Sequence, residues 1–261
     1  AATQDACWER FRNCQPVKRR YVWKMGPMVL NLRKYFNVGA EAWFTDAGTD
    51  FCLPETGDIF EDPQRQALVQ LGINAGRIMN IRQVHGGTVV EVDEKESGFR
   101  EEPLIKADGM ITDIPDIVLA VRKADCVPVF LYDPVRRSIG LVHAGWKSAR
   151  QKIVSLAVEM MGQCFGSCPS DLKAVFGPAI HSCCYQVSRD FQDIFPDEVR
   201  QRGGDYFFDL PAVSRRQLLE MGVSGGNISD CGICTCCNQH YFSYRRQGQA
   251  AGRHLSLLTL K

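Results

Sequence analysis

The stretch VPVFLYDPVRRSIGLVHAGWKSARQKIVSLAVEMM covers residues 127–161 and places two strand-like runs before a helix-like run. Apolar residues fill 127–132 and 138–144, which predicts two buried strands. A helix is expected to follow, with Ser148 as a candidate cap and Gly162 as its end. Its expected apolar face comprises Ile153, Val154, Leu156, Ala157, Met160 and Met161. This alternation predicts an α/β fold.

The rest of the chain continues the alternation in both directions. Further strands are expected at residues 88–92, 117–121, 172–176 and 253–261. A short helix is expected from a cap at Ser188 to Phe195, and a longer one over 210–221, ended by Gly222. Proline cannot donate to a strand ladder, so Pro128 is expected at a sheet edge, at a strand start or beside a bulge.

Length and composition limit the class of protein. The chain has 261 residues, of which 45% are hydrophobic, so it can bury a substantial core. We expect one domain over residues 1–261, with 1–40 as an N-terminal extension and the first strands. The charged stretch 94–103 is expected to be a surface loop.

The charge balance gives no reason to expect nucleic acid or a membrane surface as a partner, because the formal net charge is +1. The run Lys18-Arg19-Arg20 predicts a solvated face, with a binding patch as the alternative. The polar start of the chain does not resemble a signal peptide, and no uncharged run reaches the roughly 20 apolar residues that span a bilayer. We therefore expect a cytoplasmic protein, either a monomer or a homodimer.

Three metal-binding side chains lie at the ends of predicted strands. His85 precedes the strand at 88–92, Cys126 lies between two strands, and His143 lies where a strand gives way to a helix. Strand ends are where open α/β sheets place ligands. Zinc prefers imidazole nitrogen and thiolate sulfur, and three protein ligands leave a fourth position open for chemistry. Spacing alone leaves a second interpretation open, in which two structural histidines accompany a buried thiol.

Six sequence blocks in the same order and separation resemble the YfiH/YlmD family, whose animal member is known as FAMIN. The blocks are QVHG (83–86), ADC (124–126), HAGW (143–146), FGPAI (176–180), CCYQV (183–187) and FSYRR (242–246). The match in order and separation covers residues 83–256. The resemblance implies a layered α-β-β-α sandwich with mixed sheets. It also implies that His85, Cys126 and His143 are the zinc ligands.

The resemblance implies two activities on small molecules. Members cleave adenosine, inosine and methylthioadenosine with phosphate, as purine nucleoside phosphorylases, and they also deaminate adenosine. The family is also described as a polyphenol oxidase, or laccase. Asp125 lies next to Cys126 and is a candidate general acid or base, or a partner of a ligand histidine. The alternative for Asp125 is a turn residue that satisfies backbone amides.

Phosphate requires cationic donors, and four side chains are candidates: Lys147, Arg245, Arg246 and Arg253. Each of them is equally compatible with a structural salt bridge. Two positions depart from the family pattern. Lys147 stands where relatives usually have Arg, and Asp46 stands where the FSTRxGG block has a cation.

The chain has twelve cysteines, most of which we expect to be reduced thiols. The densest group is Cys231, Cys234, Cys236 and Cys237. Its spacing leaves a second metal site or a redox pair open, but we favour a wall of the active site. Cys183-Cys184 is expected to pack locally. His254 is expected in a strand with no catalytic role.

Two other enzyme classes fit the same three side chains. A copper-dependent phenol oxidase would use His85, Cys126 and His143 as a His₂Cys set, with Cu²⁺ at the zinc position. Against it, the five scattered histidines cannot build the usual four-copper arrangement. A thiol hydrolase would instead use Cys126 as nucleophile and His143 as base, without a metal.

Overall fold

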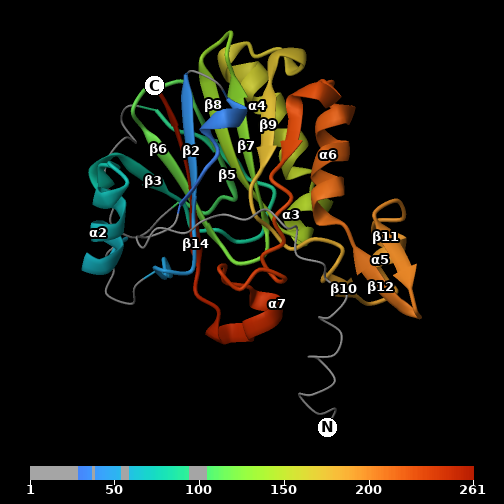
Figure 1. Cartoon of the computed structure of the whole chain (residues 1–261). Coiled ribbons are helices and arrows are strands. Elements are labelled where there is room, and N and C mark those ends of the chain that lie inside the picture. Colours follow the sequence, from blue (N-terminus) through green and yellow to red (C-terminus); the bar gives the residue numbers. More distant parts are fainter. Residues whose placement is uncertain (1–28, 37–38, 54–58, 94–104) are drawn as a thin grey trace.

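A computed structural model describes residues 29–36, 39–53, 59–93 and 105–261 of the chain (Figure 1). The polar N-terminal start, the basic run at 18–20 and the expected loop at 94–103 lie outside the described residues. Two mixed sheets face each other, and helices cover both outer faces (Figure 1). This arrangement is the layered α-β-β-α sandwich expected above.

The first sheet has five strands in the order β1-β2-β14-β6-β3. Their bounds are β1 Val29–Asn31, β2 Ala40–Thr45, β14 His254–Leu260, β6 Val118–Lys123 and β3 Ile78–Asn80. Only the β3–β6 pair is parallel. In this strand order, β14 lies at the centre of the sheet. All seven of its residues are buried, because both faces of the sheet are covered.

The second sheet has six strands in the order β13-β9-β7-β8-β5-β4. Their bounds are β13 Ile228–Asp230, β9 Lys173–Phe176, β7 Val127–Asp133, β8 Ser138–Ala144, β5 Gly109–Thr112 and β4 Val89–Glu91. The hairpin β7–β8 is central and wholly buried, as its apolar runs predict. Pro128 is the second residue of β7 and precedes the pairing with β9, which begins at Val129. The strand start is one of its three expected places.

Three apolar clusters separate the four layers. Between the two sheets lie side chains such as Leu119, Phe130 and Leu258. A second cluster fills the space between the six-stranded sheet and helices α4 (Ile153–Phe165) and α6 (Leu210–Glu220). The third lies between the five-stranded sheet and α2 (Asp62–Gln70), which covers the opposite face of the molecule (Figure 1).

The helix expected from Ser148 differs from the prediction at both ends and in the middle. It begins as α3 (Trp146–Arg150), with Gly145 as its N-cap. Lys152 has a left-handed conformation (φ 57°), which breaks the helix before α4 begins. Helix α4 then continues through Gly162 to Gly166, whose φ of 69° suits a glycine C-cap.

Smaller elements complete the fold. A third sheet has the order β10-β12-β11, with β10 Gln186–Val187, β12 Asp205–Phe208 and β11 Val199–Arg202. Its β11–β12 hairpin was not predicted from the sequence, although Gly203-Gly204 marks the turn. Two short helices are α5 (Phe191–Ile194), whose N-cap is Asp190 and not Ser188, and α7 (Tyr244–Gln247). Single 3-10 turns lie at Arg33–Tyr35, Ala75–Arg77, Pro169–Asp171, Gly225–Asn227 and Gly248–Ala250. No described helix has the length and apolar character needed to cross a bilayer.

Candidate metal centre

The six-stranded sheet brings His85, Cys126 and His143 together where its strands begin or end on one side. His85 precedes β4, Cys126 precedes β7, and His143 is the penultimate residue of β8. Strand β8 is antiparallel to both β7 and β5, so its end lies beside the start of β7. One donor atom from each of the three side chains lies within 4.8 Å of the others. The two imidazole rings have centroids 4.9 Å apart.

This donor set fits a zinc ion. With Zn–N near 2.1 Å and Zn–S near 2.3 Å, tetrahedral ligand atoms lie about 3.3–3.6 Å apart. The three donors therefore need only small movements to reach that spacing. Burial decreases across the group, because His143 is 2% exposed, Cys126 is half-buried and His85 is exposed. The side of the cluster next to His85 can therefore admit a further ligand.

Asp108, which no sequence pattern indicated, positions two of the three candidate ligands. Its Oδ1 lies 2.9 Å from Nδ1 of His143 and accepts the backbone N–H of His85 at 3.0 Å. Its Oδ2 accepts the N–H groups of Gly86 and Val84 at 2.7 and 3.1 Å. These bonds hold His85 in a left-handed conformation (φ 57°). A carboxylate behind a ligand histidine is the usual support of a zinc site.

The charges of the cluster reinforce one another. Burial alone would raise the pKa of the Cys126 thiol, but the neighbouring His143 and His85 lower it well below its usual range. Burial alone would lower the pKa of His143, but Cys126 and Asp108 raise it. The pair therefore favours a thiolate beside an imidazolium. A thiolate is the form of cysteine that binds metal ions.

The turn after His143 has no room for a side chain at Gly145. A Cβ atom there would lie 3.0 Å from Cδ2 of His85 and 3.1 Å from Sγ of Cys126. Both distances are tighter than ordinary van der Waals contact. The glycine of the HAGW block therefore leaves the space in which two candidate ligands meet.

Asp125 joins the Cys126 loop to a distant segment. Its Oδ1 accepts the Thr235 hydroxyl at 2.6 Å. Its Oδ2 accepts the Ser243 hydroxyl at 3.0 Å and the backbone N–H of Arg245 at 2.6 Å. Both carboxylate oxygens are thus engaged, and the residue itself has φ 82°. These contacts favour the turn-residue interpretation, and the carboxylate that touches His143 is Asp108.

The four cations proposed for phosphate fall into two groups. The Arg246 guanidinium donates to the carbonyls of Thr235, Cys236, Asn238 and Tyr241. The Arg253 guanidinium donates to Ala251 and Gly252. Both groups are therefore engaged in structural contacts with the backbone.

Arg245 and Lys147 are the exposed members of the set. Arg245 donates one hydrogen bond to the carbonyl of Gln186 at 2.6 Å and lies 5.1 Å from the ring centre of Tyr185. Lys147 lies on α3, four residues after His143, with Nζ 5.6 Å from the ring centre of Trp146. The backbone of Arg245 binds Asp125, which precedes Cys126. Lys147 is close to His143 in the sequence.

Two further expectations concern Asp46 and His254. The carboxylate of Asp46 accepts the N–H of Gly48 at 2.8 Å, so it caps its own turn. His254 is the first residue of β14 and is fully buried. It packs against the rings of Phe44, Tyr241 and Phe242. Its place in a strand is as expected.

The expectation that Cys183-Cys184 packs locally is wrong. The Sγ atoms of both residues approach Sγ of Cys237, at 3.3 and 3.2 Å, across more than fifty residues of sequence. Cys234 completes a four-sulfur group in which all atoms lie within 4.8 Å of one another. Sequence spacing could not reveal this group, because the two halves come from separate loops.

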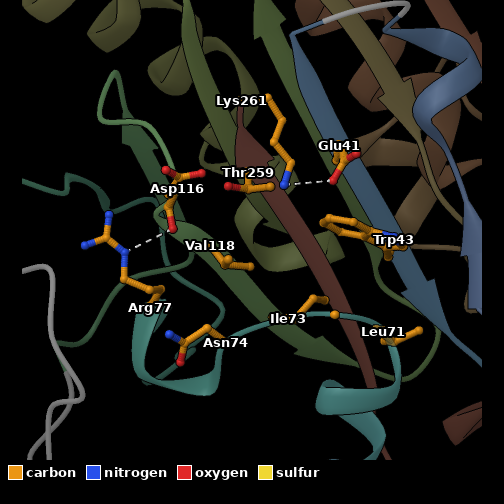
Figure 2. A pocket seen from close by; sticks show the side chains of 11 residues that line it. Glu41, Trp43, Leu71, Ile73, Asn74, Arg77, Asp116, Val118, Thr259 and Lys261 are labelled. Atoms are coloured by element: carbon orange, nitrogen blue, oxygen red, sulfur yellow. Dashed lines mark hydrogen bonds and ion pairs between the residues drawn. The ribbon is translucent and has the colours of Figure 1, made fainter.

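A cavity of about 400 Å³ lies elsewhere, on the α2 side of the five-stranded sheet (Figure 2). Its described lining contains neither histidine nor cysteine. Lys261 pairs with Glu41 there at 3.2 Å, and Arg77 donates to the carbonyl of Asp116 at 3.3 Å (Figure 2). The cavity is therefore separate from the metal cluster, and these charged groups already have partners.

Comparison with known proteins covers the part of the chain that contains the candidate metal centre. Residues 58–261 match the family model described as multi-copper polyphenol oxidoreductase laccase. The chain belongs to this family. Among its relatives, purine nucleoside phosphorylase YlmD of Bacillus subtilis is 34% identical over 192 residues, which cover 69% of each chain. A purine nucleoside phosphorylase of Borreliella burgdorferi is 32% identical over 65% of this chain and 74% of its own.

Solved structures give the same family assignment. The Bacillus licheniformis hypothetical protein YfiH superposes with a TM-score of 0.80 at 29% identity, covering 90% of this chain and 97% of its own. YlmD from Geobacillus stearothermophilus superposes with a TM-score of 0.77 at 27% identity, covering 86% and 93%. The YfiH/YlmD resemblance drawn from the six sequence blocks is thereby confirmed.

Proposed function

We propose that the chain is a zinc-dependent purine nucleoside phosphorylase acting on adenosine, inosine and methylthioadenosine, with accompanying adenosine deaminase activity. The observation that carries the proposal is the group of His85, Cys126 and His143, backed by Asp108 and open on one side. Relatives named purine nucleoside phosphorylase support the reaction class. The bound zinc ion would supply Lewis-acid polarisation and a water of lowered pKa, which deamination requires.

The remaining chemistry belongs to the side chains around the cluster. In phosphorolysis, a phosphate oxygen forms a bond to C1′ of the ribose while the bond from C1′ to the base breaks. Exposed Arg245 and Lys147 would bind the phosphate, because the backbone of Arg245 binds Asp125 beside Cys126 and Lys147 lies on α3, which follows the His143 turn. Asp108 would keep the Nδ1 of His143 occupied, so that its other ring nitrogen faces the site.

The test measures metal content and two reactions on one preparation. We expect phosphate-dependent release of hypoxanthine from inosine and no oxidation of syringaldazine. The variant His85→Ala should lose one equivalent of zinc and the phosphorolysis, while its circular dichroism stays unchanged. His240→Ala changes an exposed histidine outside the cluster and should keep both. Phosphorolysis by His85→Ala that has lost this equivalent of zinc would contradict the zinc proposal.

A copper-dependent phenol oxidase is the second candidate, because two histidines and a cysteine also suit a copper site. The description of the family model favours it. Only His85 and His143 of the five histidines belong to the cluster, too few for a four-copper centre. Copper in the purified protein, together with syringaldazine oxidation and no inosine cleavage, would decide for this alternative.

A further inference from the structure

We propose that the thiols of Cys183, Cys184 and Cys234 bind a second metal ion, a thiophilic Zn²⁺ or Cu⁺, which fastens two loops of the molecule together. No donor is shared with the His85, Cys126 and His143 cluster. The proposal is independent of the reaction at that cluster.

The sulfur atoms are already close enough for a shared ion. The Sγ atoms of the three cysteines and of Cys237 all lie within 4.8 Å of one another. Sulfur ligands around a zinc ion with Zn–S near 2.3 Å lie about 3.8 Å apart. Cys183, Cys184 and Cys234 are free thiols, whereas Cys237 is disulfide-bonded, so the three thiols are the proposed ligands. Thiolates select Zn²⁺ and Cu⁺ over harder cations such as Mg²⁺.

The backbone around the thiols is built to hold them in place. The two loops pair through a parallel bridge between Ala179 and Cys234. In this bridge, Ala179 donates to Ile233 at 3.1 Å and accepts from Thr235 at 2.9 Å. A tight turn follows, in which the N–H of Cys184 donates to the carbonyl of His181 at 3.0 Å. This turn presents two adjacent thiols to the opposite loop.

Hydrogen bonds link the thiols of this group. The thiols of Cys183 and Cys184 donate to the sulfur of Cys234, which also accepts the backbone N–H groups of His181 and Cys237. These contacts orient the Cys234 sulfur towards the other two thiols. Cys236 adds a further buried thiol, which hydrogen-bonds to Cys184.

The proposed ion would also stabilise the turn that precedes Cys126 of the first metal site. Thr235 follows Cys234 and donates to Asp125 at 2.6 Å. Ile180 lies three residues before Cys183, and its N–H donates to the carbonyl of Asp125 at 2.8 Å. Asp125 precedes the candidate ligand Cys126. An ion between the two loops would therefore fix two of the hydrogen bonds that hold this turn.

The test counts metal ions in the full chain. We expect two equivalents in the wild type and one in the double variant Cys184→Ser/Cys234→Ser. The matched control Cys164→Ser/Cys168→Ser changes two exposed cysteines outside the cluster and should keep two. If the double variant fails to fold, Cys183→Ser, at an exposed position, should weaken binding of the second ion. Wild-type metal content in the double variant would overturn the proposal.

Spectroscopy identifies the ligands separately from the first site. In Cys126→Ser, added Co²⁺ should still give the intense near-ultraviolet sulfur-to-metal absorption, and the further change Cys184→Ser/Cys234→Ser should remove it. Parallel titrations with Zn²⁺ and Cu⁺ show which ion is held more tightly. An absent band in Cys126→Ser would overturn the proposal. So would Cys183, Cys184 and Cys234 found in disulfides after purification under reducing conditions.

Discussion

Asp108 shows what a single residue adds to the candidate metal centre. It is fully buried, yet it contacts four groups of the 84–86 loop and of His143. In the sequence it is one of thirty acidic residues, and nothing in its neighbours singles it out. The three candidate ligands were found through residue type and the six blocks. Asp108, which supports these ligands, could not be found in this way, because hydrogen bonds between distant segments leave no local sequence pattern.

The first prediction concerns Asp108→Asn. An asparagine keeps one acceptor oxygen but replaces the other with an NH₂ group, which cannot accept from backbone N–H groups. Either His143 or the 84–86 loop then loses its partner. We expect zinc affinity at the first site to fall about 10–100-fold, the usual effect of removing such a support. Competition with a chromophoric chelator measures this affinity.

Asp113→Asn is the matched control for Asp108→Asn, since Asp113 is exposed and the change removes the same charge. It should bind zinc as the wild type does. Unchanged affinity in Asp108→Asn would mean that the ligands do not depend on the carboxylate. The measurement should use the Cys184→Ser/Cys234→Ser background, so that only the first site is counted.

Among the elements, the hairpin β7–β8 was predictable and the end of β6 was not. Both hairpin strands carry long apolar runs, and the structure keeps their expected bounds almost unchanged. Strand β6 was expected to stop at Val121, before two cations, but it continues to Lys123. Arg122 remains buried because it donates to Phe51, Asn80 and Ile59. Only tertiary contacts make two charged residues compatible with a buried strand.

Lys123 at the end of β6 gives a pH prediction. Its amine is buried, donates to the carbonyl of Pro178 and lies 4.1 Å from the ring centre of Phe44. Burial lowers its pKa from an ordinary value of 10.5 to about 7, against the opposing influence of Cys126, Cys231 and Asp125. Between these two values the unfolded chain holds the proton and the folded chain releases it. Raising the pH from 7 towards 10 should therefore increase the free energy of unfolding.

In Lys123→Met this pH-dependent gain should disappear. One proton contributes at most about 1.4 kcal/mol per pH unit to the slope, so the difference from wild type is measurable by urea denaturation at pH 7, 8 and 9. Lys106→Met changes an exposed lysine and should follow the wild-type curve. Parallel pH profiles for wild type and Lys123→Met would show that the amine titrates normally.

At the scale of the whole molecule, the layered architecture followed from the alternation of strands and helices together with the six blocks. Strand order did not follow, because β14 reaches the centre of the first sheet from the far end of the chain. The candidate metal centre depends on this long-range assembly. It joins the loop before β4, the turn before β7 and the end of β8, which only the folded sheet brings together. An ion there should stabilise the native state selectively.

Metal removal should therefore lower the melting temperature by an amount set by mass action. Zinc held at a hundredfold excess over its Kd stabilises the folded state by about 2.7 kcal/mol. For a chain of this size each kcal/mol shifts the Tm by about 2–4 °C, so a chelator should lower it by about 5–10 °C. The measurement belongs in Cys184→Ser/Cys234→Ser, which isolates the first site. Adding His85→Ala to that background removes one of the three joined segments and should abolish the shift. An equal shift in both proteins would mean that the stabilising ion binds somewhere other than the candidate metal centre.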